Sequence, residues 1–331
     1  MKILVTGNAG FIGFHTTLKL FQSRSNTVVG IDSLNQYYDL NLKVSRLKEL
    51  SKISKIKKIN YKFYKLNLTS IKSLEKICKK YRFDRIVHLA AQPGVRYSLI
   101  NPKSYIDNNL VGFFNILECS KKFKIKHLIY ASSSSVYGDG LEQPSRESSE
   151  TSKPLQLYAA TKKSNEVMAY AYSNLYKIPM TCLRFFTVYG PWGRPDMALF
   201  KFTKSIIENK TINLHNYGNH SRDYTYVEDI VAAIKKLVNK GPSKINRIPH
   251  QIFNIGNGNT VKLKTFIKIL EKKLNKKAKI KMLKIQPGEI LNTHSDTKLL
   301  SKKINYKSKI PFEKGVQNFL IWYKNFYQIN K

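Results

Sequence analysis

The chain is poor in cysteine, in acidic residues and in long apolar runs. Its three cysteines, Cys78, Cys119 and Cys182, are scattered through 331 residues, which argues against a disulfide framework or a cysteine-based zinc site and is typical of a reducing cytoplasm. No apolar run approaches the roughly 18 residues that a membrane span needs. The strand pattern that follows Met1 does not fit a signal peptide, and the histidines show no ligand spacing. We therefore expect a cytoplasmic protein with no metal site and no membrane partner.

Acidic residues number 21 against 58 lysines and arginines, so the formal net charge is +37. Only ten of the basic residues are arginines, and the lysines are spread along the chain. Such a surplus is either a solvated lysine-rich surface or a surface that binds the phosphates of nucleic acid. Because no nucleic-acid recognition motif accompanies the charge, we expect no nucleic-acid partner. A positive field would still speed the association of an anionic substrate.

Apolar, β-branched runs alternate with helical patterns through the first half of the chain. The expected strands are residues 2–6, 27–31, 61–66, 85–89, 127–131 and 180–185, and the expected helices are 10–21, 71–80, 108–119 and 158–174. This alternation predicts an α/β fold with a Rossmann-like, doubly wound parallel sheet. Beyond residue 186 turn formers are dense, and shorter helices are expected at 198–209, 228–238, 264–274 and 316–327. We expect a Rossmann domain over 1–185, with a returning segment near 225–255, and a smaller C-terminal α/β substrate-binding lobe over 186–331.

A glycine-rich turn, VTGNAGFIGFH, joins the first expected strand to the first expected helix. Gly7 permits a tight turn, Gly10 lets the backbone approach a pyrophosphate, and Gly13 lets helix and strand pack closely. The helix that Phe11 and Ile12 open would point its N-terminal N–H groups and partial positive charge at the phosphates. The position of the glycines between a strand and a helix predicts a dinucleotide site.

Asp32 ends the second expected strand, nineteen residues beyond Gly13. A carboxylate at this position can accept hydrogen bonds from the ribose hydroxyls of a dinucleotide and would repel a 2′-phosphate. No arginine follows immediately to offset that repulsion. Together with the glycines, Asp32 therefore predicts NAD rather than NADP as the cofactor.

Tyr158-Ala159-Ala160-Thr161-Lys162 begins a further expected helix, and its two ends share one helix face. A Lys162 ammonium beside the Tyr158 phenol would lower the pKa of the phenol, so that Tyr158 becomes a base suited to neutral pH. Lys162 would also hold the nicotinamide ribose. This spacing arises readily by chance in a chain with 20 tyrosines. It gains weight from the serine-lined strand end, YASSSSVYG, that precedes it.

These features resemble the extended short-chain dehydrogenase/reductases that act on nucleotide sugars, and within them most closely the UDP-glucuronate 4-epimerases. The resemblance covers the whole chain and is carried by VTGNAGFIG, HLAAQPGVRYSL, NNLVGFFNILE, YASSSSVYG, YAATK, LRFFTVYGPWGRPDMALF, SRDYTYVEDI and QPGE. It implies that Ser133 shares the proton path of Tyr158 and that Asn109 supports the active-site helix. It also implies NAD contacts from Asn67, Leu89, Ala90, Ala91 and Phe185, and UDP-sugar contacts from Ser134, Ser135, Thr187, Arg194 and Arg222.

Two positions depart from the family pattern, and the resemblance also implies an assembly. Asn67 stands where relatives usually carry an aspartate against the adenine, and Gln286 stands where several related epimerases carry an arginine. Family members are usually homodimers built on the helices that follow Asn108 and begin at Tyr158. We therefore expect a homodimer.

The serines bear on the type of reaction. Relatives that dehydrate sugars carry an Asp-Glu pair just after the position of Ser133, and relatives that decarboxylate UDP-glucuronate carry a glutamate there. Here Ser134 and Ser135 follow, and neutral hydroxyls cannot remove the C5 proton but can hydrogen-bond a carboxylate without charge repulsion. The resemblance thus implies interconversion of UDP-glucuronate and UDP-galacturonate through a 4-keto intermediate with transient NAD reduction. A 4-epimerase of UDP-hexoses or UDP-N-acetylhexosamines and a UDP-glucuronate decarboxylase remain as alternatives.

Overall fold

The computed structural model describes residues 1–139, 142–243, 247–286 and 288–329. The chain divides into two compact units, and each unit is assembled from separate stretches of the chain. Unit 1 comprises Met1–Val136, Thr151–Phe185 and Val231–Phe253, and unit 2 comprises Tyr137–Glu150, Phe186–Ile230 and Asn254–Lys331. The chain therefore leaves unit 1 and returns to it twice.

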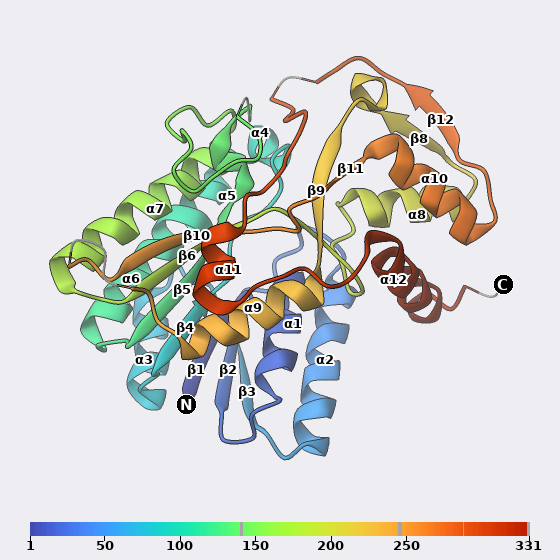
Figure 1. Ribbon diagram of the computed structural model, residues 1–331. Coiled ribbons are helices and arrows are strands. Elements are labelled where there is room, and N and C mark those ends of the chain that lie inside the picture. The colour runs from blue at the N-terminus through green and yellow to red at the C-terminus, as the bar shows by residue number, and fades with distance from the viewer. Residues whose placement is uncertain (140–141, 244–246, 287, 330–331) are drawn as a thin grey trace. The chain divides into compact units, whose positions relative to one another are not determined.

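Unit 1 is built on a seven-stranded sheet (Figure 1). Its strands are β1 (Lys2–Thr6), β2 (Thr27–Asp32), β3 (Asn60–Lys65), β4 (Arg85–His88), β5 (His127–Ser133), β6 (Met180–Phe185) and β10 (His250–Ile255). They follow the order β10-β6-β5-β4-β1-β2-β3, and the neighbours from β3 to β6 run parallel. Strand β6 is buried along its whole length. Such unbroken apolar burial is typical of a parallel sheet that is covered on both faces.

Helices cover both faces of this sheet (Figure 1). On one side lie α3 (Ile71–Tyr81), α6 (Gly112–Lys122) and α7 (Leu157–Tyr176), whose apolar side chains join those of the strands in one core cluster. On the other lie α1 (Phe11–Leu20), α2 (Leu40–Ile56) and α9 (Val227–Asn239). Short helical segments, α4 (Tyr97–Ile100), α5 (Pro102–Tyr105) and the π-helical η1 (Ile106–Val111), lead into α6, and the 3-10 turn η2 (Ser134–Tyr137) follows β5.

Unit 2 contains two small sheets and an aromatic core. One sheet has the order β11 (Thr260–Lys262), β9 (Ser221–Tyr226), β7 (Thr187–Tyr189), and the other pairs β12 (Lys279–Met282) with β8 (Thr211–Leu214). The remaining elements are α8 (Ala198–Ile207), η3 (His215–Gly218), α10 (Leu263–Leu274), α11 (Lys298–Ile304) and α12 (Phe312–Phe326). Phe200 of α8 packs against Phe319, Trp322 and Tyr323 of α12. These large rings give the unit a core despite its short strands.

The predicted fold class is confirmed. The structure also contains a long helix, α2, that the sequence analysis did not predict. Its inward side carries Lys43 and Arg46 beside Leu42 and Leu50, and these buried basic residues interrupt the apolar period by which a helix is recognised.

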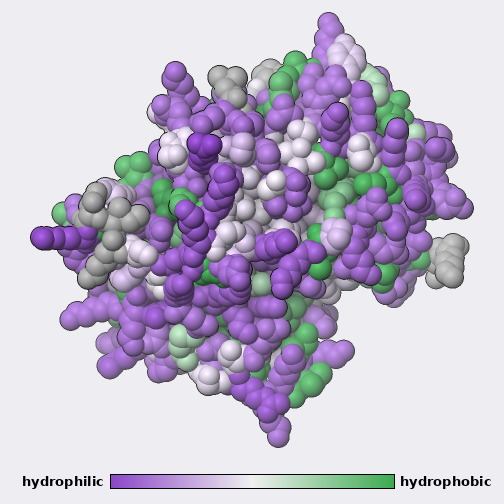
Figure 2. Space-filling model, in the orientation of Figure 1, coloured by the Kyte–Doolittle hydropathy of each residue, from purple (hydrophilic) through white to green (hydrophobic). Residues whose placement is uncertain are grey.

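Figure 2 shows a largely hydrophilic surface on the visible face, with apolar residues scattered over it. Among the described helices, none combines the length and apolarity required to cross a lipid bilayer.

Candidate active site

The glycine-rich turn has a backbone that side chains would disrupt. Gly7 has a φ of +70°, and a Cβ there would lie 2.7 Å from the Ala90 nitrogen. A Cβ on Gly13 would lie 2.0 Å from the Gly7 carbonyl oxygen. Gly10 caps α1 without a side chain, so the N–H groups at the start of α1 face the turn. This arrangement fits the pyrophosphate of a dinucleotide.

Asp32 lies at the end of β2, beside the same turn. Its two carboxylate oxygens accept hydrogen bonds from the Ala9 N–H at 3.1 Å and from the Leu34 N–H at 2.9 Å. These bonds fix the carboxylate at the end of the strand. Each oxygen has a second lone pair with which to accept from a ribose hydroxyl. Asp32 is therefore in the position that an NAD ribose requires.

Helix α2 brings two basic residues to this end of the sheet that the sequence reasoning missed. The fully buried Arg46 donates to the Ala9 carbonyl at 2.8 Å and to the Tyr38 hydroxyl at 2.7 Å. Burial lowers the pKa of Lys43, although the charge of Asp32 opposes the shift. In a chain so rich in lysine, nothing in the local sequence distinguishes these two buried residues from the many basic residues that are exposed to solvent.

The predicted cofactor residues lie at the carboxyl ends of the strands. Leu89, Ala90 and Ala91 follow β4, and the Ala90 N–H donates to the Thr6 hydroxyl at 3.2 Å. Phe185 ends β6 opposite Ser133 of β5. Asn67 follows β3 and is exposed, and its side-chain oxygen accepts from the Thr69 N–H at 3.1 Å. In α/β sheets this carboxyl edge is where ligands bind.

Tyr158 and Lys162 lie on the first turns of α7. The Tyr158 ring packs edge-on against Tyr105, with 6.1 Å between ring centroids. Lys162 is 2 % exposed and donates from Nζ to the Ala131 carbonyl of β5 at 2.9 Å. Burial lowers the pKa of Lys162 to about 8, although the thiol of Cys182 and the carboxylate of Glu166 oppose the shift. The lysine is thus held by the backbone of the strand that ends in Ser133.

Asn109 connects the loop after β4 to α7. Its side-chain oxygen accepts from the Gln92 N–H at 2.7 Å, and its Nδ2 donates to the Gln92 carbonyl at 3.2 Å. The same Nδ2 donates to the Thr161 hydroxyl at 3.1 Å, and Thr161 donates to the Tyr158 carbonyl at 2.8 Å. The π-helical turn of η1 places Asn109 in this position. Asn109 therefore ties together the two segments that carry the predicted cofactor and catalytic residues.

The four consecutive serines face in different directions. Ser133 and Ser134 are partly exposed, whereas Ser132 and Ser135 are buried. Ser135 donates to the Ser133 hydroxyl oxygen from its own hydroxyl at 2.9 Å and from its N–H at 3.2 Å. The Ser135 hydroxyl, which the sequence assigns to the substrate, is thus directed at Ser133 in this structure.

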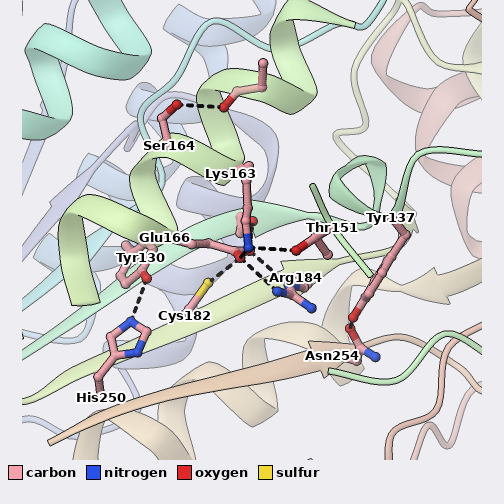
Figure 3. A network of polar contacts seen from close by, with 12 residues as sticks. Tyr130, Tyr137, Thr151, Lys163, Ser164, Glu166, Cys182, Arg184, His250 and Asn254 are labelled. Carbon is pink, nitrogen blue, oxygen red and sulfur yellow. Dashed lines mark hydrogen bonds and ion pairs between the residues drawn. The ribbon is translucent and has the colours of Figure 1, made fainter. Parts of the chain in front are cut away.

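Behind the serines lies a buried carboxylate that the sequence reasoning also missed. Glu166 follows Lys162 by one turn of α7, and it accepts a hydrogen bond from Ser132 of β5. It also pairs with Arg184 of β6 (Figure 3). The signal available in the sequence is Arg184 itself, which is a charged residue inside the apolar run MTCLRF. A buried arginine requires a partner, and the carboxylate on the neighbouring helix provides it.

In unit 2 the predicted substrate residues lie on strands and turns. Thr187 begins β7 and pairs with Tyr224 of β9. Arg194 forms a two-pronged ion pair with Asp196, with 3.0 Å between Nε and Oδ1. Arg222 donates to the Leu291 carbonyl at 2.7 Å, to the Ser221 carbonyl at 3.0 Å and to the Ile290 carbonyl. Both guanidinium groups are therefore oriented by protein contacts.

Asp223, next to Arg222, holds that part of unit 2 together. Its fully buried carboxylate accepts from the N–H groups of Asn257 at 2.6 Å and Gly258 at 3.0 Å, and from the Ser295 hydroxyl at 2.5 Å. Two backbone amides and one hydroxyl thus hold this carboxylate in place. Within the described ranges, no group of three or more His, Cys, Asp or Glu side chains has an arrangement that holds a metal ion.

The class of the chain follows from comparison with known proteins. A family model described as "NAD dependent epimerase/dehydratase family" matches residues 3–256. The chain belongs to this family, and the predicted resemblance to the nucleotide-sugar enzymes of the extended short-chain dehydrogenase/reductase type is confirmed.

Individual relatives show which members of the family this chain is similar to. The chain is 41% identical over 341 residues to a probable UDP-glucuronate 4-epimerase of Rhizobium meliloti, with 99% of this chain and 98% of that protein covered. It is 47% identical over 341 residues to Protein CapI of Staphylococcus aureus, with 99% of this chain and 100% of that protein covered. The structure resembles a UDP-glucuronic acid 4-epimerase of Bacillus cereus in complex with UDP-glucuronic acid and NAD, with a TM-score of 0.90, 33% identity and coverage of 99% of this chain and 100% of that one.

Proposed function

We propose that this chain is a UDP-glucuronate 4-epimerase that interconverts UDP-glucuronate and UDP-galacturonate with NAD as cofactor. The observation that carries the proposal is the strand end at Ser133, which offers hydroxyls two residues beyond the Ala131 carbonyl that Lys162 bonds and no acidic residue through Tyr137. The carboxylate bonded to this strand, Glu166, is buried and bound to Arg184. The acidic side chains that decarboxylating and dehydrating relatives carry just after the position of Ser133, for acid–base chemistry near C5 and C6, are thus missing from Ser133–Tyr137.

The glycine turn, Asp32 and the segment 89–91 hold the cofactor in this proposal. NAD, when bound there, would supply hydride transfer from C4 of the sugar and back to the opposite face of the ring. Tyr158 takes the proton of the C4 hydroxyl as that hydroxyl is oxidised, and gives it back on reduction. The Lys162 ammonium favours the phenolate form that this step needs.

Ser133 acts as a hydrogen-bond donor to the C4 oxygen. Both donors of Ser135, the hydroxyl and the N–H, point at the Ser133 oxygen. Because these lone-pair directions are filled from Ser135, the Ser133 proton is directed elsewhere, and we assign it to the sugar. Ser135 therefore acts on the substrate through Ser133.

The carboxylate of the substrate must be protected during the reaction. Oxidation at C4 leaves a ketone β to the C6 carboxylate, and such an acid loses CO₂ when its C5–C6 bond stands perpendicular to the carbonyl plane. Ser134 and Thr187 hydrogen-bond the carboxylate and keep it out of that alignment. Each charge-assisted hydrogen bond contributes about 1.5–3 kcal/mol, so the loss of one releases CO₂ roughly tenfold to a hundredfold faster. Arg194 and Arg222 bind the UDP moiety.

The experiment is incubation of the purified chain with UDP-glucuronate, without added cofactor, followed by NMR. UDP-galacturonate as the product supports the proposal and shows that NAD is retained. A UDP-pentose as the main product would identify a decarboxylase, and turnover of UDP-glucose or UDP-N-acetylglucosamine alone would identify an epimerase of neutral sugars.

The clamp on the carboxylate has its own test. Ser134→Ala and Thr187→Ala are expected to form UDP-pentose and CO₂ beside the epimer, whereas Ser51→Ala, at an exposed position of α2, is the matched control. Epimerisation at the wild-type rate without extra CO₂ in both variants would refute the clamp.

We also propose a homodimer built on α6 and α7. Four apolar side chains on η1, α6 and α7 are between 42% and 59% exposed, namely Val111, Phe114, Val167 and Tyr170. Two copies of one apolar face pack together in a two-fold dimer. Analytical ultracentrifugation is expected to show a dimer for the wild type and a monomer for Phe114→Glu with Val167→Glu, and a monomeric wild type would refute this assembly.

A further inference from the structure

The interior of unit 1 contains one carboxylate that the proposed reaction does not use. The Glu166 side chain is 2% exposed, and its Oε1 accepts from the Ser132 hydroxyl at 2.6 Å and from Arg184 Nε at 2.9 Å. Its Oε2 accepts from Arg184 Nη2 at 2.8 Å and lies 3.8 Å from Lys163 Nζ (Figure 3). Burial raises the pKa of Glu166, but the bonds from Arg184 and Ser132 outweigh it and hold the pKa below its usual value. The group is therefore an anion at neutral pH.

A buried ion pair is weak evidence for stability alone, because two apolar residues of similar volume often do as well. The position of this pair is more informative. Ser132 lies opposite Arg184 in the register of β5 and β6, and Ser133 lies opposite Phe185. At the end of β5, two consecutive residues are thus hydrogen-bonded by side chains of α7, and the residue after them is the proposed donor to the substrate. Lys162 bonds the Ala131 carbonyl, Glu166 bonds the Ser132 hydroxyl, and Ser133 is the proposed donor.

We propose that Glu166, paired with Arg184, is a positioning residue that fixes Ser133 on β5 relative to Tyr158 and Lys162 on α7 and keeps a negative charge near the Lys162 ammonium. This inference rests on the proposed function. Because Glu166 and Lys162 are one turn apart, one helix face grips the strand at two successive residues. A small displacement of reacting groups costs roughly a hundredfold in rate.

The same carboxylate opposes the loss of charge on Lys162. Burial lowers the pKa of Lys162 to about 8, and the negative charge of Glu166 acts in the raising direction. Removal of that charge therefore lowers the pKa further, and the ammonium is lost at a lower pH. Among the described residues, the other ionisable groups around Lys162 and Glu166 are Tyr158 and Lys163 of α7, His88 of β4, Tyr130 of β5, Cys182 and Arg184 of β6, and His250 of β10.

The first experiment compares Glu166→Gln with the wild type in the full-length enzyme. The glutamine keeps the shape of the side chain and removes its charge. We expect kcat to fall roughly tenfold to a hundredfold with little change in KM, and the alkaline limb of the kcat–pH profile to move to lower pH. A wild-type kcat and an unchanged pH profile would overturn the proposal.

A second variant separates positioning from packing. Glu166→Leu with Arg184→Met removes both charges and keeps the core filled. We expect this double variant to melt at or above the temperature of Glu166→Gln while its kcat stays low. If it recovers both stability and the wild-type kcat and pH profile, the pair only fills space and the proposal is wrong.

Thr181→Val is the matched control, because it removes a buried hydrogen bond of 2.8 Å to His127 from the other end of β6. We expect it to lower the melting temperature and leave kcat and its pH profile unchanged. The wild type is assayed with UDP-glucuronate, UDP-glucose and UDP-N-acetylglucosamine in the same series. If only a neutral sugar reacts, the proposed function fails, while the ratio of variant to wild-type kcat on that sugar still decides the positioning role.

Discussion

The two units hold their candidate functional side chains in different ways. In unit 1 the sheet and α7 hold them directly, since Lys162 bonds a strand carbonyl and Ser133 accepts from Ser135. In unit 2 the two arginines are oriented by neighbours in turns and loops, Asp196 for Arg194 and the 290–291 backbone for Arg222. The first arrangement resists displacement, because the carboxyl ends of packed parallel strands move only with the core. The second arrangement depends on surface segments. A bound anion would compete with Asp196 and with the 290–291 backbone for the two guanidinium groups.

The largest effect is expected in unit 1, from Tyr158→Phe. The phenol is the proposed base, and loss of a general base lowers kcat by roughly a hundredfold to ten-thousandfold. KM is expected to change little, because the ring remains. The assay is conversion of UDP-glucuronate followed by NMR, and Tyr176→Phe on the exposed end of the same helix is the control. A loss of less than tenfold would remove Tyr158 from the chemistry.

Next in size is Gly13→Ala, which tests whether the turn must approach α1 closely. The new Cβ would meet the Gly7 oxygen at 2.0 Å, so the helix must shift. Such overpacking costs about 1–3 kcal/mol of folding free energy, and we expect the purified protein to lack bound NAD. Calorimetry and the absorbance of extracted cofactor measure the two effects. Gly241→Ala, where a Cβ meets nothing within 4 Å, is expected to match the wild type.

A smaller effect is expected in unit 2, from Arg194→Ala and Arg222→Ala. Each variant loses a proposed charge-assisted contact to the UDP moiety, worth about 1.5–3 kcal/mol, so KM rises tenfold or more while kcat changes less. Initial rates over a range of UDP-glucuronate concentrations give both constants. Arg24→Ala, at an exposed position of unit 1, controls for the loss of one positive charge. An unchanged KM in both variants would mean that these arginines only stabilise unit 2.

The smallest effect is expected when the pH is lowered, and it concerns the stability of the core of unit 1. Burial, and for His88 the nearby Lys162 charge, lowers the pKa of His88 to about 3, and burial lowers that of His250 to about 4. Between these values and the unfolded pKa near 6.5 the unfolded chain binds more protons, so stability falls as pH falls. From pH 7.5 to 5.5 we expect a loss of about 3 kcal/mol for the two groups together.

Urea unfolding at the two pH values measures this loss. Both pKa values lie well below the unfolded value, so the two histidines contribute about equally, and His250→Gln, which keeps a partner for the Tyr130 hydroxyl, is expected to lose about half of the pH dependence. Equal stability of the wild type at pH 7.5 and 5.5 would show that the two imidazoles take up protons in the folded chain as readily as in the unfolded chain.

The contrast between the units also explains what could be predicted from sequence. Local motifs in unit 1, such as the glycine turn and the Tyr158–Lys162 pair, carry their geometry within a few residues, so both could be placed before the structure. The bond from Ser135 to Ser133 and the pairing of Glu166 with Arg184 depend on strand register and on the packing of α7. Helix α2 was missed because its buried face carries basic residues. The contacts of Arg222 join residues about 70 positions apart, beyond the reach of any local pattern.

The late return of β10 has a consequence for biosynthesis. Strand β6 is buried throughout and lies between β5 and β10, yet 64 residues separate the end of β6 at Phe185 from the start of β10 at His250. While the ribosome adds the intervening residues, the nascent chain presents an unpaired apolar strand edge of the kind that attracts other chains. A fragment that stops at residue 185 keeps that edge permanently, so residues 1–185 are expected to accumulate as insoluble material when they are produced alone.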